Sequence, residues 1–204
     1  MSRRRKHRGA GASRSGRENP PKADSHKRFG AWRDWIAAKK PVWRFTVLLF
    51  TGLAVFYAGY TLFSTSRYME GFLRLIASIS AAALSALGYE TRADGAVVMG
   101  RAFAFEVVRG CDGLEPVGFL LAAALATPAT VRTRCLFALV GGVFLLALNV
   151  VRLVSLALVD AYIPRLTEAI HWNVWPAVII VVVVLLWVCW ARRAGLTDWK
   201  VGPT

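Results

Sequence analysis

The residue types that could do chemistry stand in three short polar pieces of an otherwise apolar chain. The first piece, Glu106–Glu115, holds a thiol at Cys111 together with carboxylates and an arginine. The second holds Asn149 and Arg152, and the third begins at His171. A thiol becomes an effective nucleophile as a thiolate, which forms beside a histidine or a fixed cation. Histidine can take that proton and return it to a leaving amine, and arginine can hold an oxyanion. These residue types fit nucleophilic acyl transfer.

The polar pieces lie in or beside segments that are long enough to cross a membrane. Apolar runs with few charges cover residues 45–63, 114–131, 135–163 and 171–190, and the chain as a whole is 56% hydrophobic. About 20 helical residues cross a hydrocarbon core of ~30 Å. Arginines cluster at the inner ends of these runs, so we expect four spans with both termini in the cytoplasm.

Counting along these helices places the three polar pieces at one depth. Arg152 lies 17 residues beyond Cys135, at the cytoplasmic turn, which is roughly 25 Å along a helix. Cys111 and His171 stand at the outer starts of the second and fourth spans. The three side chains are therefore expected to meet near the outer membrane face.

Helical spacing adds two expectations about shared faces. Asn149, Arg152 and Ser155 are three residues apart, which predicts one common helix face. Cys111 and Glu115 are four apart, and the same rule predicts that they share a face of the second span.

Two segments outside these spans complete the predicted fold. Tyr68–Gly88 is helical but weakly hydrophobic, and it could be a short span or a helix on the outer surface. A span there would move Cys111 to the cytoplasm and the arginines at 132, 134, 192 and 193 to the outside, against the positive-inside rule, so we expect a surface helix. Ala96–Met99 and Ala102–Val108 alternate as strands do and predict a hairpin. The expected fold class is an all-α membrane protein with about four transmembrane helices, an extracytoplasmic helix and a short β-hairpin.

The net charge of +14 is concentrated at the N-terminus, where residues 1–44 hold 14 of the 26 Lys and Arg. We predict four parts: a disordered basic cytoplasmic tail (1–30), an interfacial helix (31–43), a transmembrane domain (44–193) and a cytoplasmic C-terminal tail (194–204). A basic tail beside a span serves topology and anionic lipid. Specific nucleic-acid binding is not expected.

Each candidate residue also has a plainer interpretation. Cys111 could be a small packed thiol, Arg152 could reach towards lipid headgroups, and His171 could be an ordinary interfacial side chain. The carboxylates of Glu106 and Glu115 could pair with Arg101 or Arg109 nearby. By composition and spacing alone, an enzyme is one reading among several.

Rival functions make different demands on the sequence. A non-catalytic membrane subunit or chaperone would use the polar cluster only to hold helices together. A thiol–disulfide enzyme would need a second cysteine near Cys111, whereas Cys135 and Cys189 are expected at the inner ends of their helices, in packing roles. A serine intramembrane protease lacks support, because no Gly-x-Ser-Gly occurs. The spacing of the cysteines predicts no metal site, and no cofactor is expected.

At these residues the chain resembles the exosortase/archaeosortase family of membrane cysteine transpeptidases, and most of all the exosortase H subgroup. The resemblance covers residues 45–193. It rests on Glu106 ahead of Gly110–Glu115, on Ala147–Arg152 inside a hydrophobic helix, and on His171–Trp175.

The resemblance implies an activity, a substrate and a location. The substrates would be secreted proteins that end in a sorting signal made of a short motif, a hydrophobic helix and a basic end. The enzyme would cut near the motif at the outer face of the inner (cytoplasmic) membrane and transfer the protein to a surface acceptor. Cys111 would be the nucleophile, His171 the acid and base, and Arg152 the partner of the oxyanion. Asn149 would orient Arg152, while Glu106 and Glu115 would be supporting residues without a firm role.

Overall fold

The computed structural model describes residues 24–193. The predicted tails therefore lie partly (1–30) or wholly (194–204) outside the described residues. The chain divides into two compact units after Lys40, and the residues of the three polar pieces all belong to the second unit. Segment 31–43, expected as a separate interfacial helix, is an unbroken part of α1. The elements are α1 (Asp24–Phe63), α2 (Arg67–Ala86), β1 (Thr91–Asp94), β2 (Val97–Gly100), β3 (Ala104–Glu106), α3 (Leu114–Ala126), α4 (Val131–Tyr162), α5 (Pro164–Ala169), the π-helical turn η1 (Ile170–Val174) and α6 (Trp175–Arg193).

Four helical stretches among the described residues are long and apolar enough to cross a membrane, namely Val42–Phe63, Arg67–Ala86, Val131–Tyr162 and Pro164–Arg193. The expected number is confirmed, but the set differs from the prediction. The predicted span over 114–131 is wrong in length, because α3 has only 13 residues and reaches ~20 Å at 1.5 Å per residue.

Proline explains where α3 ends and where α4 ends. Thr127 and Ile163 each precede a proline and have non-helical backbone angles (φ −83°, ψ 133° and φ −142°, ψ 66°), since the following ring disfavours helical geometry. Thr130 then caps α4, with its hydroxyl accepting from the Thr133 amide at 3.4 Å. The result is a short α3 beside a 32-residue α4.

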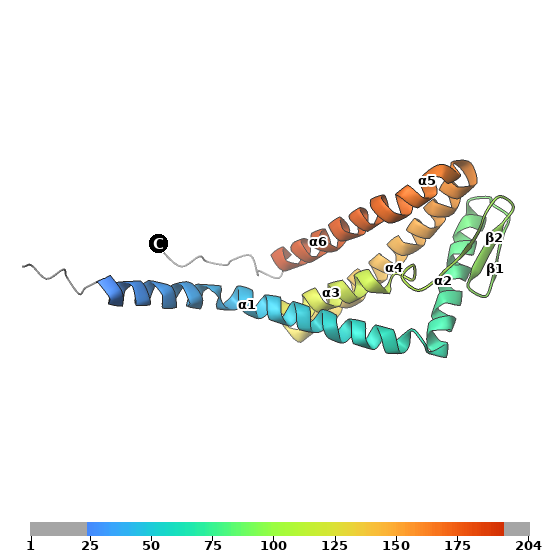
Figure 1. The fold of residues 1–204 in the computed structure, drawn as a ribbon. Helices are drawn as coiled ribbons and strands as arrows, with labels where there is room; N and C mark the ends of the chain where they lie inside the picture. Colours follow the sequence, from blue (N-terminus) through green and yellow to red (C-terminus); the bar gives the residue numbers. More distant parts are fainter. Residues whose placement is uncertain (1–23, 194–204) are drawn as a thin grey trace, which may run out of the picture. The chain divides into compact units, whose positions relative to one another are not determined.

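Helix α2 is amphipathic, with one buried and one exposed side, and it is also one of the four stretches long and apolar enough to cross a membrane. Ser66 caps its start, Glu70 lies in its first turn, and the Glu70–Arg74 pair is on its exposed side. Figure 1 shows α2 running across the direction of α4 and α6. Its buried side, at helical spacing, consists of Met69, Ile76, Ala77, Ser80, Ala81 and Leu84.

The structure adds a third strand to the predicted two-stranded hairpin. The structure has a three-stranded antiparallel sheet in the order β1-β2-β3, with Val98 opposite both Ala93 and Phe105. The added strand, β1, turns into β2 through Gly95 at φ +63°, a left-handed geometry that glycine adopts without strain. Because β1 is mostly polar, the alternation of apolar and polar residues did not predict it as a strand.

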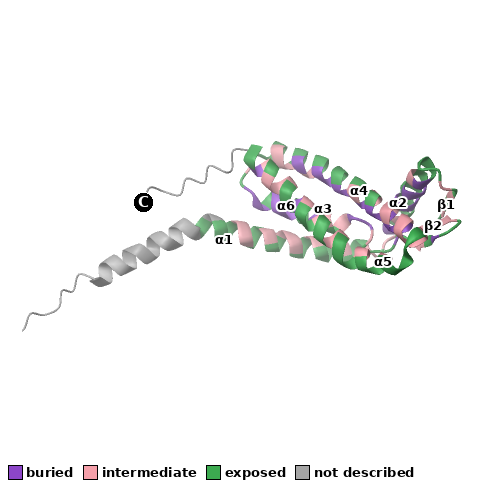
Figure 2. Ribbon diagram, turned by 90° about the horizontal axis from the view of Figure 1, so that it is seen from above, coloured by how far each residue is buried: buried purple, intermediate pink, exposed green. Residues whose placement is uncertain are grey.

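Helix α4 takes part in two separate hydrophobic cores. Its first part packs with α3 and α6 around Leu120, Leu145 and Val183. Its last part packs with α2 and the sheet through Leu153 and Ala157. Figure 2 shows buried residues concentrated on α2, α3 and α4, with few on α6 and none on the coloured part of α1. The two cores meet along α4 near its Asn149–Arg152 stretch.

The core between α2 and the sheet can be tested with a leucine pair on one helix. Leu84 is fully buried, whereas Leu75 is 54% exposed. Leu84→Ala should lower the free energy of unfolding by about 2–5 kcal/mol, because it leaves a cavity. Leu75→Ala should change it by less than about 0.5 kcal/mol. Denaturant titration in micelles measures both, and equal losses would contradict the burial of Leu84 in this core.

Candidate active site

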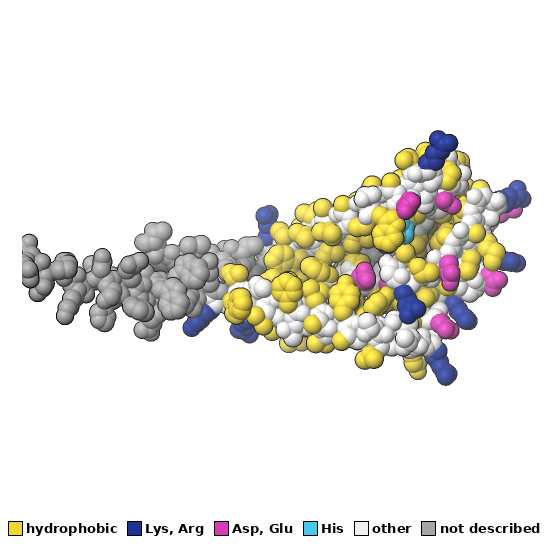
Figure 3. All heavy atoms as spheres, in the orientation of Figure 1, with side chains coloured by type: hydrophobic (Ala, Val, Ile, Leu, Met, Phe, Trp, Pro, Cys, Tyr) yellow, Lys and Arg dark blue, Asp and Glu magenta, His cyan; other side chains and the backbone are white. Residues whose placement is uncertain are grey.

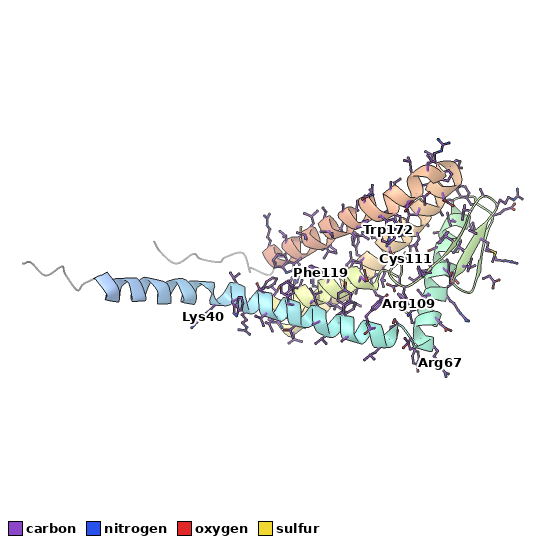
Figure 4. All side chains as sticks on the ribbon, viewed as in Figure 1. Lys40, Arg67, Arg109, Cys111, Phe119 and Trp172 are labelled. Atoms are coloured by element: carbon purple, nitrogen blue, oxygen red, sulfur yellow. The ribbon has the colours of Figure 1, made fainter. Side chains whose placement is uncertain are left out.

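The loop Gly110–Gly113 turns the chain from β3 into α3. Gly110 and Gly113 have φ of +84° and +82°, which a side chain would strain. A Cβ on Gly113 would also overlap Asn149 on α4. The amide of Cys111 donates to the carbonyl of Val108 at 2.9 Å. These constraints fix a tight turn with Cys111 at its tip (Figure 4).

Three side chains from different elements meet at the Cys111 sulfur. Its Sγ lies 3.9 Å from Nε2 of His171 and 4.0 Å from Nη2 of Arg152. Nη2 of Arg152 in turn lies 3.4 Å from Nε2 of His171. The structure thus brings together the three residues that the sequence analysis placed at one depth.

The chemistry of the partners decides how the imidazole is protonated. Arginine has donors and no acceptor, so a hydrogen bond from Arg152 requires a lone pair on Nε2 of His171. The tautomer that carries its proton on Nδ1 is neutral and offers that lone pair. The Cys111 thiol can donate to the same lone pair. This is the arrangement in which histidine accepts a proton from a nucleophile.

Burial raises the pKa of the Cys111 thiol above its ordinary value, and Arg152 opposes that shift. The carboxylates of Asp112 and Glu115 raise the thiol pKa further. The resting sulfur is accordingly a thiol at neutral pH. A thiolate would form here by proton transfer to a base, and His171 is the base within reach of the sulfur.

The position of His171 differs from the prediction. The last apolar helical stretch begins at Pro164 rather than at His171, and His171 lies within the π-helical turn η1 between α5 and α6. Such single π turns are rare and occur often at functional sites. The turn faces the imidazole towards Cys111, while Trp172 beside it is 69% exposed. Apolar periodicity alone does not reveal a π turn.

Asn149 forms its hydrogen bond with the Gly110–Gly113 loop and not with Arg152. Its Nδ2 donates to the carbonyl oxygen of Cys111 at 2.9 Å, although the family resemblance implied a role in orienting Arg152. Asn149 and Arg152 are both buried, which confirms their shared helix face. Ser155 on the next turn is half-buried and donates to the carbonyl of Arg152 at 2.8 Å.

The two supporting glutamates stand apart from the cluster. Glu106 is exposed in β3, opposite Val97. Glu115 is exposed in the first turn of α3, where a carboxylate interacts favourably with the positive end of the helix dipole. The predicted shared helix face of Cys111 and Glu115 is wrong, because α3 begins only at Leu114. Arg101, considered as a partner for these glutamates, pairs instead with Glu90 at 2.6 Å.

Asp112 in the Gly110–Gly113 loop and Tyr60, which contacts this loop, were not predicted to belong to the site. Asp112 is fully buried, and its carboxylate accepts from the Leu114 amide at 2.8 Å and from the Tyr60 hydroxyl at 2.6 Å. The N-cap of α3 is Gly113, and an aspartate beside a helix start commonly accepts from a nearby backbone amide. Nothing in the sequence linked it to Tyr60, 52 residues earlier.

The remaining cysteines lie elsewhere on the helices. All three cysteines are free. Cys135 is near the start of α4, 17 residues before Arg152 and so about 25 Å along the helix, and Cys189 is near the end of α6. Neither is placed to form a disulfide with Cys111. Among the described residues, no three His, Cys, Asp or Glu side chains gather as a metal site would require.

Comparison with known proteins agrees with the family resemblance. The family model of transmembrane exosortases (Exosortase_EpsH) matches residues 35–188, which includes all three side chains of the cluster. No curated protein and no solved structure matches the chain.

The pH dependence of Cys111 alkylation tests the electrostatics of the site. In a chain with Cys135→Ala and Cys189→Ala, iodoacetamide should react with Cys111 at a rate that rises with pH, with its midpoint above the ordinary thiol pKa. Arg152→Met should move the midpoint higher still, because it removes the nearest charge that favours the thiolate. Arg109→Met, an exposed arginine outside the cluster, should not move it. Equal midpoints in all three proteins would contradict this assignment.

Proposed function

The chain belongs to the transmembrane exosortase family, and from that premise we propose that it is a cysteine transpeptidase with Cys111 as its nucleophile. In this proposal, secreted proteins are cut near a C-terminal sorting signal and passed through an acyl-enzyme to an acceptor at the cell surface. Cys111, Arg152 and His171 carry the chemistry, and Asn149 supports the loop that bears the nucleophile.

The observation that carries the proposal is a buried guanidinium beside a thiol and an imidazole. Arg152 is 92% buried in α4, and no carboxylate among the described residues forms an ion pair with it. A buried, uncompensated cation is costly. It gains a counter-charge when the sulfur or a carbonyl oxygen beside it becomes negative, so this environment favours the anions of acyl transfer.

The proposed reaction moves one proton and forms one bond at a time. His171 Nε2 takes the Cys111 proton as Sγ attacks the carbonyl carbon of the substrate peptide bond. The carbonyl oxygen becomes an oxyanion that Arg152 stabilises. His171 then gives its proton to the leaving amine as the C–N bond breaks, which leaves a thioester on Cys111. An acceptor nucleophile, deprotonated by His171, attacks the thioester and restores the thiol.

The charges on the helices favour a site on the outer face of the membrane. Arginines without nearby acidic residues mark the ends of the helices away from the site, at Arg44, Arg132, Arg134, Arg192 and Arg193. In Figure 3 the acidic side chains gather towards α2, the sheet and α5, and apolar side chains cover the helices beyond them. Cationic ends remain in the cytoplasm, so we place the termini there and the site at the outer surface of the inner membrane.

A substrate with a hydrophobic C-terminal helix suits this position. Such a helix lies in the bilayer, so its scissile bond must be met at the level where the apolar belt ends. The apolar surface of α4 and α6 below the site is exposed, with Leu139, Val143 and Ile180 more than 60% exposed. Lipid or a partner helix covers surfaces of this kind.

Replacement of the three side chains tests the proposal in cells or vesicles that hold a reporter. The reporter is a secreted protein from the same genome that ends in a short motif, an apolar helix and a basic cluster. Cys111→Ala should abolish its cleavage, His171→Gln should slow it by about 10²–10⁴-fold, and Arg152→Gln by about 10²–10³-fold. Cys189→Ala is the matched control and should cleave at the wild-type rate. Cleavage that survives Cys111→Ala would remove the nucleophile from the proposal.

A trapped intermediate tests the covalent step separately. In the absence of acceptor, part of the reporter should migrate with the mass of the chain, 22.4 kDa, added to its cleaved fragment. Neutral hydroxylamine should release this adduct, because it cleaves thioesters. An adduct that also forms on Cys111→Ala would contradict an acyl-enzyme at this residue.

A further inference from the structure

The loop that bears Cys111 is tied to α1 by a hydrogen-bonded pair, Tyr60 and Asp112. The Tyr60 hydroxyl donates to Oδ2 of Asp112 at 2.6 Å and accepts from the amide of Gly110 at 3.3 Å. The other carboxylate oxygen accepts from the Leu114 amide at 2.8 Å. The pair therefore contacts the residues on both sides of Cys111 and the start of α3.

Tyr60 is half-buried, and wherever the burial of α1 side chains is described they are half-buried or exposed. Phe56 lies against Gly118, where an added Cβ would overlap its ring, and it stacks on Tyr60 at 5.9 Å. These apolar contacts place the ring of Tyr60 beside the loop. The hydroxyl then supplies a directional contact that packing alone does not.

We propose that Tyr60 and Asp112 are positioning residues of the transpeptidase, which hold the Cys111 turn together with Asn149. The turn is then fixed at three points: the Asn149 amide on the Cys111 carbonyl, the Tyr60 oxygen on the Gly110 amide, and the Asp112 carboxylate on the Leu114 amide. This inference rests on the proposed function. It adds a role for α1 in the geometry of the nucleophile.

The charge of Asp112 distinguishes positioning from activation. A carboxylate next to the sulfur disfavours the thiolate, and Asp112 indeed raises the pKa of Cys111. A residue chosen to make the thiol acidic would be neutral or cationic. The contact with the Leu114 amide does not explain a carboxylate either, because an asparagine side-chain oxygen could accept the same hydrogen bond. The carboxylate matters as the strong acceptor for the Tyr60 hydroxyl.

Two conservative variants separate these roles when alkylation and processing are measured together. Tyr60→Phe removes one hydroxyl and keeps the ring, and Asp112→Asn removes the charge and keeps an oxygen that can accept from the Leu114 amide. We expect each to slow reporter cleavage by about 10- to 100-fold, as the loss of a hydrogen bond to a charged group would. The double variant should be no slower than the slower single variant, because the two residues act as a pair. Tyr57→Phe, the same change at an exposed site on α1, should cleave at the wild-type rate.

The alkylation profile of Cys111 supplies the readout that a general loss of structure would not give. Asp112→Asn should lower the midpoint pH, so that alkylation at neutral pH becomes faster while cleavage becomes slower. Tyr60→Phe should keep the wild-type profile while cleavage falls. If Asp112→Asn does not accumulate in the membrane, Tyr60→Phe alone decides the matter through its cleavage rate and profile.

Three results would overturn the positioning role. They are wild-type cleavage by Tyr60→Phe, independent effects that multiply in the double variant, and cleavage that accelerates with alkylation in Asp112→Asn. Each can occur while Cys111→Ala is still inactive, in which case the proposed function stands and only the positioning role falls. Cleavage by Cys111→Ala would instead overturn the proposed function itself, and the positioning role with it.

Discussion

The burial of one guanidinium constrains the whole site. Arg152 lies on a continuous apolar helix, and its contacts within the cluster are with the Cys111 thiol and the His171 imidazole, neither of which is a carboxylate. A cation in such a place is stabilised when negative charge develops beside it. Arg152 therefore makes the region around the Cys111 sulfur more favourable for an anion than its burial alone would. The same burial keeps the resting thiol protonated, which leaves the timing of charge formation to His171.

Helix α4 supplies the frame that holds this constraint in place. Its first turns pack with α3 and α6, and its last turns pack with α2 and the sheet. Asn149 and Arg152 lie where these two cores meet, so both side chains are held by packing on either side. The sheet delivers the chain to Cys111, and the proline break before α5 brings His171 back over it. The short α3 begins directly after the Gly110–Gly113 loop, so its start helps to fix the position of Cys111.

Particular residues show why some of the site was predictable. The order of Cys111, Arg152 and His171 along the chain, with the lengths of the apolar runs between them, sets their depth once each run is a helix. The shared face of Asn149 and Arg152 follows from helical geometry alone. The hydrogen bond from Tyr60 to Asp112 had no such basis, because it joins residues from two elements whose relative rotation is a matter of packing.

The sequence by itself determined the apolar helices and the level of the polar residues along them, because hydrophobic length and helical period act locally. The order of its motifs also indicated the family to which the chain belongs. Tertiary structure decided the rest. It shortened the second predicted span, added a strand before the hairpin, placed His171 on a π turn and turned Asn149 towards the Cys111 carbonyl. Each of these depends on which neighbour a backbone or side-chain group finds for its hydrogen bonds, and that choice is made only when distant segments pack together.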